Sequence, residues 1–340
     1  MTASRWWIFL LLSCTYGCSS KGSADAHAPT PGEGTDQTWT EGTKITGNVV
    51  IDAGKTVTIA PGAHVSFAKG ASVSIQGTLK AQSRDKHALL DSADGWAGLV
   101  VDGGSLDLDG VDIQNADRAI RVQAGTGSYQ YGAIKNSAAF DVQKDGALIV
   151  AHASVAGNRS PSTILGDFTA TFLDYDAGPK EGFIVQDPGA TLSIEDSHLH
   201  GSRTPDNDLI QSASPGKVHV AYVELTQAHC GMHFDDVESF DVSNVTIHDG
   251  AYGIMMYGSV DTTGERTVKS TNIFQNAGRG IEEAAPDEIQ GPITVSDGYW
   301  ANNGGGDADN IRSLTGKITV TNMSSTTPLT NVGPRGAVPW

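Results

Sequence analysis

Two stretches that begin 22 residues apart decide the fold: VHVAYVEL at residues 218–225 and FDVSNVTI at residues 240–247. Each reads apolar, any, apolar, two bend residues, apolar, any, apolar. Side chains two apart point to the same face of a β-strand, so each stretch predicts two short strands with one buried face. Two residues between the strands are too few for a reversal in this in-out register, and we expect a bend that keeps the chain coiling in one direction.

The same template returns along the chain. Clear copies start at Leu106, Leu148, Phe168, Leu192, Val218 and Phe240, and weaker copies start at Tyr129, Val268, Ile293 and Ile318. Repeats of this length that bury one face each predict a solenoid. A third apolar pair, such as Met232 and Phe234, follows a variable loop in most coils. We therefore predict an all-β, single-domain parallel β-helix of roughly ten to thirteen coils with three parallel sheets, covering residues 45–325.

The second bend residue is polar in four consecutive coils, where it is assigned to Asn244, Asn272, Asp297 and Asn322. Asparagine tolerates the left-handed conformation that such a bend requires, and stacked amides can bond to one another. With the opening stretches GKTVTIAPG at 54–62 and GWAGL at 95–99, this pattern resembles the pectate-lyase-like right-handed parallel β-helix superfamily, and in particular bacterial β-helix repeat surface lipoproteins. The resemblance implies a right-handed coil and carries no catalytic signature.

The N-terminus predicts an exported lipoprotein. Arg5 and the short apolar run at residues 6–12 indicate a signal peptide over residues 1–17, with lipidation at Cys18 or, alternatively, at Cys14. Residues 18–44 are rich in Ser, Gly, Ala, Pro and Thr and predict a flexible tether. We expect residues 326–340 to form a tail that covers the last coil. The predicted location is extracytoplasmic, lipid-anchored at the outer membrane or cell surface.

The charge and the cysteines limit the partners. The formal net charge is −17, which argues against nucleic acid and against anionic headgroups, and favours cations or neutral polyhydroxy partners. We expect membrane contact through the N-terminal lipid alone, and a monomer. Cys230 is the one cysteine beyond the N-terminal region, so no disulfide framework is predicted, and its neighbours His229 and His233 do not complete an evident ligand set.

The candidate site lies on the sheet that follows the variable loop, which usually carries the substrate groove in the resembled superfamily. Its outward positions are Arg121, Ile184, Gln211, His233, Met255, Glu282 and Arg312. Stacking of consecutive coils should bring Glu282 and Arg312 about 4.8 Å apart. The same register buries Glu283, which is costly, so a slip of this coil by one residue stays open.

Two functions fit these residues, and the first is favoured because no complete catalytic motif is present. It is a non-catalytic surface protein that binds polysaccharide or a cell-envelope partner, with contacts from Gln211, Tyr257 and Arg121. The alternative is an extracytoplasmic polysaccharide lyase, glycoside hydrolase or epimerase. Its catalytic residues would be His233, Glu282, Arg312 and Asp235, and its Ca²⁺ ligands would be Asp235, Asp236 and Glu238. The acidic loop at residues 206–208 is interpreted as a solvated turn rather than a cation site.

Overall fold

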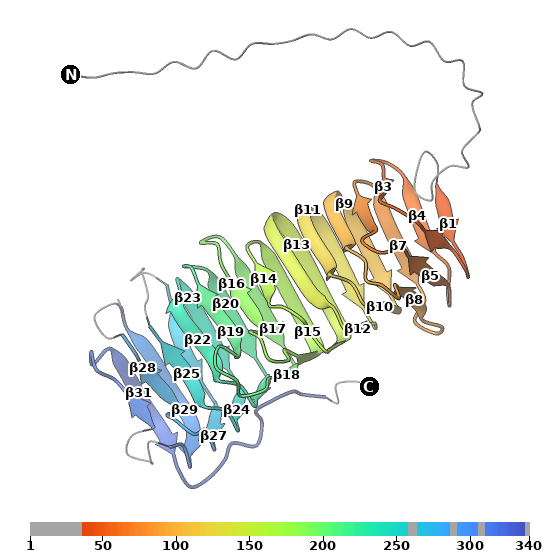
Figure 1. Cartoon of the computed structure of the whole chain (residues 1–340). Coiled ribbons are helices and arrows are strands. Elements are labelled where there is room, and N and C mark those ends of the chain that lie inside the picture. Colours follow the sequence, from red (N-terminus) through yellow and green to blue (C-terminus); the bar gives the residue numbers. More distant parts are fainter. Residues whose placement is uncertain (1–35, 258–263, 286–290, 305–309, 337–340) are drawn as a thin grey trace, which may run out of the picture.

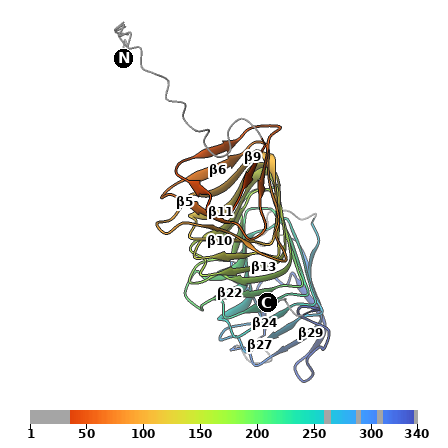
Figure 2. The ribbon, with the colours of Figure 1, turned by 90° about the vertical axis from the view of Figure 1, so that its right-hand side faces the viewer.

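The chain forms one long stack of short parallel strands. The computed structural model describes residues 36–257, 264–285, 291–304 and 310–336. Within these residues the regular structure is entirely β, with strands β1 to β31 wound into about 12 turns. Figure 1 shows the turns in sequence order from β1 to β31, and Figure 2 shows the same stack from another side, with the first and last turns at opposite ends. None of the described segments is a helix long and apolar enough to cross a bilayer.

Three parallel sheets run along the stack, and each strand pairs with its counterpart one turn away. The first sheet contains β1 (Gln37–Trp39), β4 (Thr56–Ile59), β7 (Thr78–Gln82), β17 (Thr191–Glu195), β20 (Lys217–Ala221), β23 (Ser239–Ser243) and β26 (Arg266–Lys269). The second contains β2 (Lys44–Ile45), β5 (His64–Phe67), β8 (Ala88–Asp91), β10 (Val111–Gln114), β12 (Ala133–Lys135), β18 (His198–His200), β21 (Glu224–Thr226), β24 (Thr246–His248) and β27 (Asn272–Phe274). The third contains β3 (Val49–Ile51), β6 (Ser72–Ile75), β14 (Ser162–Ile164), β16 (Phe183–Val185), β19 (Asp208–Ala213), β22 (Cys230–Asp236), β25 (Tyr252–Met256), β28 (Ile281–Glu283) and β30 (Ile311–Arg312).

Six longer strands continue around a bend from one sheet to the next. They are β9 (Gly98–Asp109), β11 (Arg118–Gln130), β13 (Ala138–Ala156), β15 (Asp167–Asp176), β29 (Ile293–Ala301) and β31 (Ile318–Ser324). The prediction of an all-β parallel solenoid with three sheets is therefore confirmed.

The core is one continuous column of inward side chains. In the six clear copies of the template, every inward position is buried, including Ser197, whose hydroxyl bonds to the Leu173 N–H and the Glu195 carbonyl. At the middle of the column Phe168 lies between Phe140 and Phe183, with ring centroids 5.4 and 5.1 Å away. Apolar burial of this extent is the main term that stabilises such a stack.

Two of the weaker copies are wrong by two residues. Tyr131 and Ser270, assigned to inward positions, adopt the left-handed conformation at the bend between the first and second sheets. The inward positions of these coils are instead Gly127 with Tyr129, and Arg266 with Val268. The template expects an apolar residue at each inward position, and these two coils begin with a glycine and an arginine instead. The assigned start of each copy therefore shifts to the next inward residue, which is apolar.

The predicted asparagine ladder is correct at Asn244, Asp297 and Asn322 and wrong at Asn272, because Ser270 occupies the bend of that coil. Asn322 donates to Asp297 Oδ1 at 3.0 Å, as stacked bend residues should. A second, buried ladder lies at the bend between the second and third sheets. There Asn276 accepts from the Gly250 N–H, and Asn303 accepts from the Asn276 N–H and side chain. These bonds satisfy backbone groups that the bends remove from the strand ladders.

Both ends of the stack differ from expectation. The solenoid begins at β1, whose Trp39 is 1% exposed, so residues 37–44 belong to the first coil and not to a tether. The described part of the tail does not cover the last coil but runs back along the bend between the first and second sheets (Figure 1). Leu329 bonds to the Asn272 side chain, the Gly333 N–H to the Asn244 carbonyl, and Arg335 to Asp196 at 2.6 Å. A side-chain amide, a backbone carbonyl and a carboxylate supply these contacts, which hydrophobic patterning does not reveal.

Candidate functional site

The predicted register of the third sheet is confirmed. Gln211 pairs with Ile184 on one side and His233 on the other, and the row continues through Met255 to Glu282 and Arg312. The pairings join β16, β19, β22, β25, β28 and β30, one strand per coil. The outward side chains of six consecutive coils therefore form one straight row on this face.

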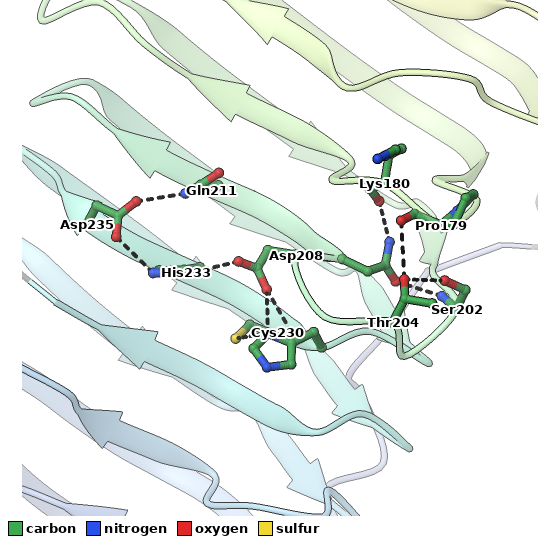
Figure 3. A network of polar contacts seen from close by, with 11 residues as sticks. Pro179, Lys180, Ser202, Thr204, Asp208, Gln211, Cys230, His233 and Asp235 are labelled. Carbon is green, nitrogen blue, oxygen red and sulfur yellow. Dashed lines mark hydrogen bonds and ion pairs between the residues drawn. The ribbon is translucent and has the colours of Figure 1, made fainter.

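His233 is held between two carboxylates. Its Nδ1 lies 2.5 Å from Asp208 Oδ2, and its Nε2 lies 2.9 Å from Asp235 Oδ1, at ion-pair distance but poorly aligned for a hydrogen bond. Asp235 also accepts a 2.7 Å hydrogen bond from Gln211 Nε2. Figure 3 shows the resulting chain of contacts from Gln211 through Asp235 and His233 to Asp208.

The two carboxylates keep His233 positively charged. Burial disfavours the imidazolium, but the hydrogen bond to Asp208, the close contact with Asp235 and the negative charges of both carboxylates outweigh it and raise the pKa of His233 to about 9. Burial likewise opposes ionisation of Asp208, yet the bond from His233 and its charge leave the pKa of Asp208 lowered. The close contact with the His233 imidazolium lowers the pKa of Asp235 as well. At neutral pH the trio is an imidazolium between two carboxylates.

Asp208 organises a second group of side chains that the sequence did not indicate. Its Oδ1 accepts from the Cys230 N–H at 3.0 Å and lies 3.2 Å from His229 Nδ1. The Cys230 sulfur lies 3.5 Å from the same imidazole nitrogen. Burial and the charge of Asp208 raise the pKa of the Cys230 thiol far above its ordinary value, so the free thiol is protonated. The loop at residues 206–208 is therefore no solvated turn at Asp208, which is 4% exposed.

Tyr257 covers His233 from the next coil. The two rings stack with centroids 4.8 Å apart and an interplanar angle of 29°, and the tyrosine side chain is 37% exposed. Glu283 pairs with Met256 across one coil, so the residue that corresponds to Tyr257 on that next coil is Ala284. A methyl group is too small to cover a phenol ring. Tyr257 is thus an aromatic platform fixed on one face by the imidazole.

A second set of stacked aromatic side chains lies elsewhere on the solenoid. At the bend between the first and second sheets, Tyr131, His152 and Phe172 stack with centroids 4.6 Å apart, and the Arg84 guanidinium lies 3.5 Å from the Tyr131 ring centre. Arg84 and His152 cover the two faces of Tyr131, and Phe172 covers the far face of His152. The three stacked residues all occupy a bend position, where an aromatic residue was not expected.

Glu282 is neutralised by arginine. Arg312 Nη1 lies 2.6 Å from its Oε1, which confirms the predicted pairing across one coil, and Arg279 Nη1 lies 3.3 Å from its Oε2. Met255, 6% exposed, separates Glu282 from His233 in the row. The two predicted catalytic groups therefore belong to separate polar clusters.

Glu283 is buried in the predicted register, so the coil does not slip. It is fully buried, and its carboxylate accepts bonds from Ser313 Oγ, the N–H groups of Leu314 and Thr315, and Thr315 Oγ1. These donors come from the segment after β30 and offset the cost of burying the charge.

The remaining predicted residues lie apart from His233. Arg121 is on the third sheet, five strands away from His233 along the row. Its side chain pairs with Asp141 at 2.7 Å. Glu238 lies 3.9 Å from Lys217. Among the described residues, the possible ligand atoms that gather within 4.8 Å of one another belong to Asp208, Cys230 and His233, and not to the predicted set of Asp235, Asp236 and Glu238.

A further ionic cluster lies on the second sheet. Glu224 bonds His198 and His248 at 2.9 Å each, and His248 also lies 2.7 Å from Asp249. Hydrogen bonds from the two imidazoles hold the pKa of Glu224 far below its ordinary value and raise the pKa of both histidines. This cluster faces away from the third sheet and is independent of His233.

No protein-family profile and no curated protein sequence matches the chain. Among solved structures, it is similar to two variants of the catalytic domain of a GH87 alpha-1,3-glucanase in complex with nigerose. The TM-score is 0.51 and the identity 12%, over 84% of this chain and 63% of that chain, so this chain spans less than two thirds of its length. An endo-xylogalacturonan hydrolase from Aspergillus tubingensis matches with a TM-score of 0.39 and 14% identity, over 87% of this chain and 90% of that chain. At these identities the likeness concerns the fold alone, and the chain has the right-handed, pectin-lyase-like parallel β-helix fold.

Proposed function

We propose that the chain is a non-catalytic β-helix protein that binds a neutral polysaccharide along the outward face of the third sheet. The observation that supports this most strongly is the exposed ring of Tyr257, which stacks on His233. Polar side chains flank the ring on the neighbouring coils. A rigid aromatic ring offers apolar area at low entropic cost, and nearby polar groups fix orientation. Gln211 and Asp235 lie on one side of the ring, and Glu282 and Arg312 on the other.

The state of the acidic and basic groups favours binding over catalysis. General acid–base catalysis needs a group that can exchange a proton with the substrate. Both nitrogens of His233 face carboxylates, and both oxygens of Glu282 face guanidinium groups. The net charge of −17 also disfavours an anionic glycan.

Replacing Tyr257 by Ala should weaken polysaccharide binding about tenfold to thirtyfold, equivalent to roughly 1.5–2 kcal/mol for the loss of one central aromatic contact. The measurement is affinity electrophoresis over a panel of neutral and acidic polysaccharides, followed by calorimetry with the tightest binder. Tyr299→Ala, a half-buried tyrosine on the second sheet, is the matched control and should bind as the parent does. Equal affinity of the Tyr257 variant and the parent would rule out this face.

A polysaccharide lyase, glycoside hydrolase or epimerase is the second candidate. The observation in its favour is the charged Asp208–His233–Asp235 trio on the sheet that also carries Arg312, in a fold shared with the catalytic domain of a glucanase. Incubation of the protein with the same panel of polysaccharides, with and without Ca²⁺, distinguishes an enzyme from a binding protein. New reducing ends or unsaturated products that disappear in His233→Gln would establish the enzyme.

We also propose that the chain is exported and held at the outer membrane or cell surface by a lipid on Cys18. The basic and apolar start of the chain and the polar segment after Cys18 support this. Expressed in a bacterium, the parent should fractionate with membranes, and Cys18→Ala should release it into the soluble exported fraction. Release by Cys14→Ala instead would assign the lipid to Cys14, and membrane retention of the double variant would refute the anchor.

A further inference from the structure

Four potential metal ligands meet where β19 and β22 begin. They are Asp208, Cys230 and His233, whose ligand atoms lie within 4.8 Å of one another, and His229. The His229 Nδ1 lies 3.2 Å from Asp208 Oδ1 and 3.5 Å from the Cys230 sulfur. Asp208 and Cys230 are buried, while His229 is about one third exposed. Figure 3 shows Asp208 at the centre of this group.

The spacing around His229 suits one small ion, and the 2.5 Å contact between His233 Nδ1 and Asp208 Oδ2 has to lengthen when the ion enters. Zinc bonds nitrogen and oxygen at about 2.0–2.2 Å and sulfur at about 2.3 Å, so donors around a tetrahedral ion lie roughly 3.3–3.8 Å apart. The contacts of the His229 nitrogen to oxygen and sulfur are close to that separation. One thiol, two imidazoles and one carboxylate form a donor set that borderline transition metals prefer and that Ca²⁺ does not.

The surroundings of His233 provide an independent indication. A histidine that binds a metal through one ring nitrogen usually offers its other nitrogen to a carboxylate, which fixes the ring. His233 directs Nδ1 to the cluster, and its Nε2 lies 2.9 Å from Asp235, which Gln211 holds in turn. The stacked Tyr257 ring restricts the imidazole further.

We propose that Asp208, Cys230 and His233, joined by His229, bind one Zn²⁺ or a similar borderline transition-metal ion. On binding, the Cys230 thiol and the imidazole nitrogen facing Asp208 release their protons to solvent, and the sulfur and nitrogen lone pairs bond the ion. The edge at His229, whose side chain is about one third exposed, is the route of entry. The site lies beneath the Tyr257 platform and does not depend on polysaccharide binding, so Tyr257→Ala should still bind one ion per chain.

Cobalt titration tests the site. The full chain carries three cysteines, so the experiment uses a Cys14→Ser, Cys18→Ser background in which Cys230 is the single thiol. Metal-free protein titrated with Co²⁺ should saturate at one ion per chain, with tetrahedral visible bands and a thiolate-to-cobalt charge-transfer band, and Zn²⁺ should displace the cobalt. Cys230→Ser, nearly isosteric, should abolish the charge-transfer band.

Two further variants make the result decisive. Asp235→Asn, beyond the ligands, should weaken Co²⁺ binding about 10- to 100-fold. His229→Ala alters a partly exposed side chain, so it serves as the test if Cys230→Ser fails to fold. It should weaken Co²⁺ binding about as much as Asp235→Asn does. His248→Ala, from the thiol-free cluster on the second sheet, is the control and should change nothing. No saturable uptake, or an identical cobalt spectrum with and without the Cys230 sulfur, would overturn the proposal.

Discussion

His233 should contribute a fall of about 3 kcal/mol in the free energy of unfolding as the pH rises from about 6.5 to above 9, in the metal-free chain with a chelator present. The folded chain raises the pKa of His233 from an ordinary 6.5 to about 9, so it holds that proton more tightly than the unfolded chain does. Each pKa unit corresponds to about 1.36 kcal/mol. The stabilisation from His233 is fully present below 6.5, its pKa in the unfolded chain. It is lost as the pH rises through about 9, its pKa in the folded chain.

Urea unfolding at a series of pH values measures this loss, and an NMR titration of the His233 ring assigns it. Asp235→Asn removes one of the two carboxylates and should lower the pKa of His233 and flatten the pH dependence. The histidines of the second-sheet cluster remain in that variant, so their share is unchanged. A His233 ring that titrates at its ordinary pKa in the folded parent would show that the two carboxylates do not hold the charge.

Glu283→Ala should destabilise the chain by about 3 kcal/mol. The substitution leaves a cavity and removes the acceptor for two backbone N–H groups and two hydroxyls of the segment at residues 313–315. Unmet buried donors cost about 1–3 kcal/mol, in addition to the lost packing. Because that segment follows Arg312, the pairing of Arg312 with Glu282 should loosen as well.

Chemical denaturation measures the total loss, and hydrogen exchange at β28 and β30 locates it. The matched control is Glu265→Ala, an exposed glutamate just before β26 in the same coil, which should change stability by less than about 0.5 kcal/mol. If both variants lose the same small amount, the buried carboxylate does not anchor the last coils.

Most of the fold follows from the sequence because inward positions repeat strictly. The pairing of Gln211, His233, Met255, Glu282 and Arg312 was predicted, since period two fixes which side chains face outward. The pattern failed where an inward position holds a non-apolar residue. Gly127 and Arg266 are such positions, and the bend residue Ser270 was consequently missed.

The candidate site was predicted less completely, for a different reason. Asp208 precedes the outward position Gln211 by three residues and lies in an acidic stretch that is typical of solvated turns. Its role arises because stacking places it beside Cys230, the first residue of β22 on the next coil. Such contacts depend on where each loop re-enters the sheet. The return of the tail to Asp196, 139 residues earlier in the chain, depends likewise on a path that no local pattern records.

Hydroxyl-radical footprinting with the tightest-binding neutral polysaccharide tests the central claim, that the third sheet is the binding face. The account predicts that saturating polysaccharide protects Tyr257 and leaves the oxidation of Tyr131 and Phe172, at the bend between the first and second sheets, unchanged. Protection of those bend residues with Tyr257 still fully oxidised would contradict it.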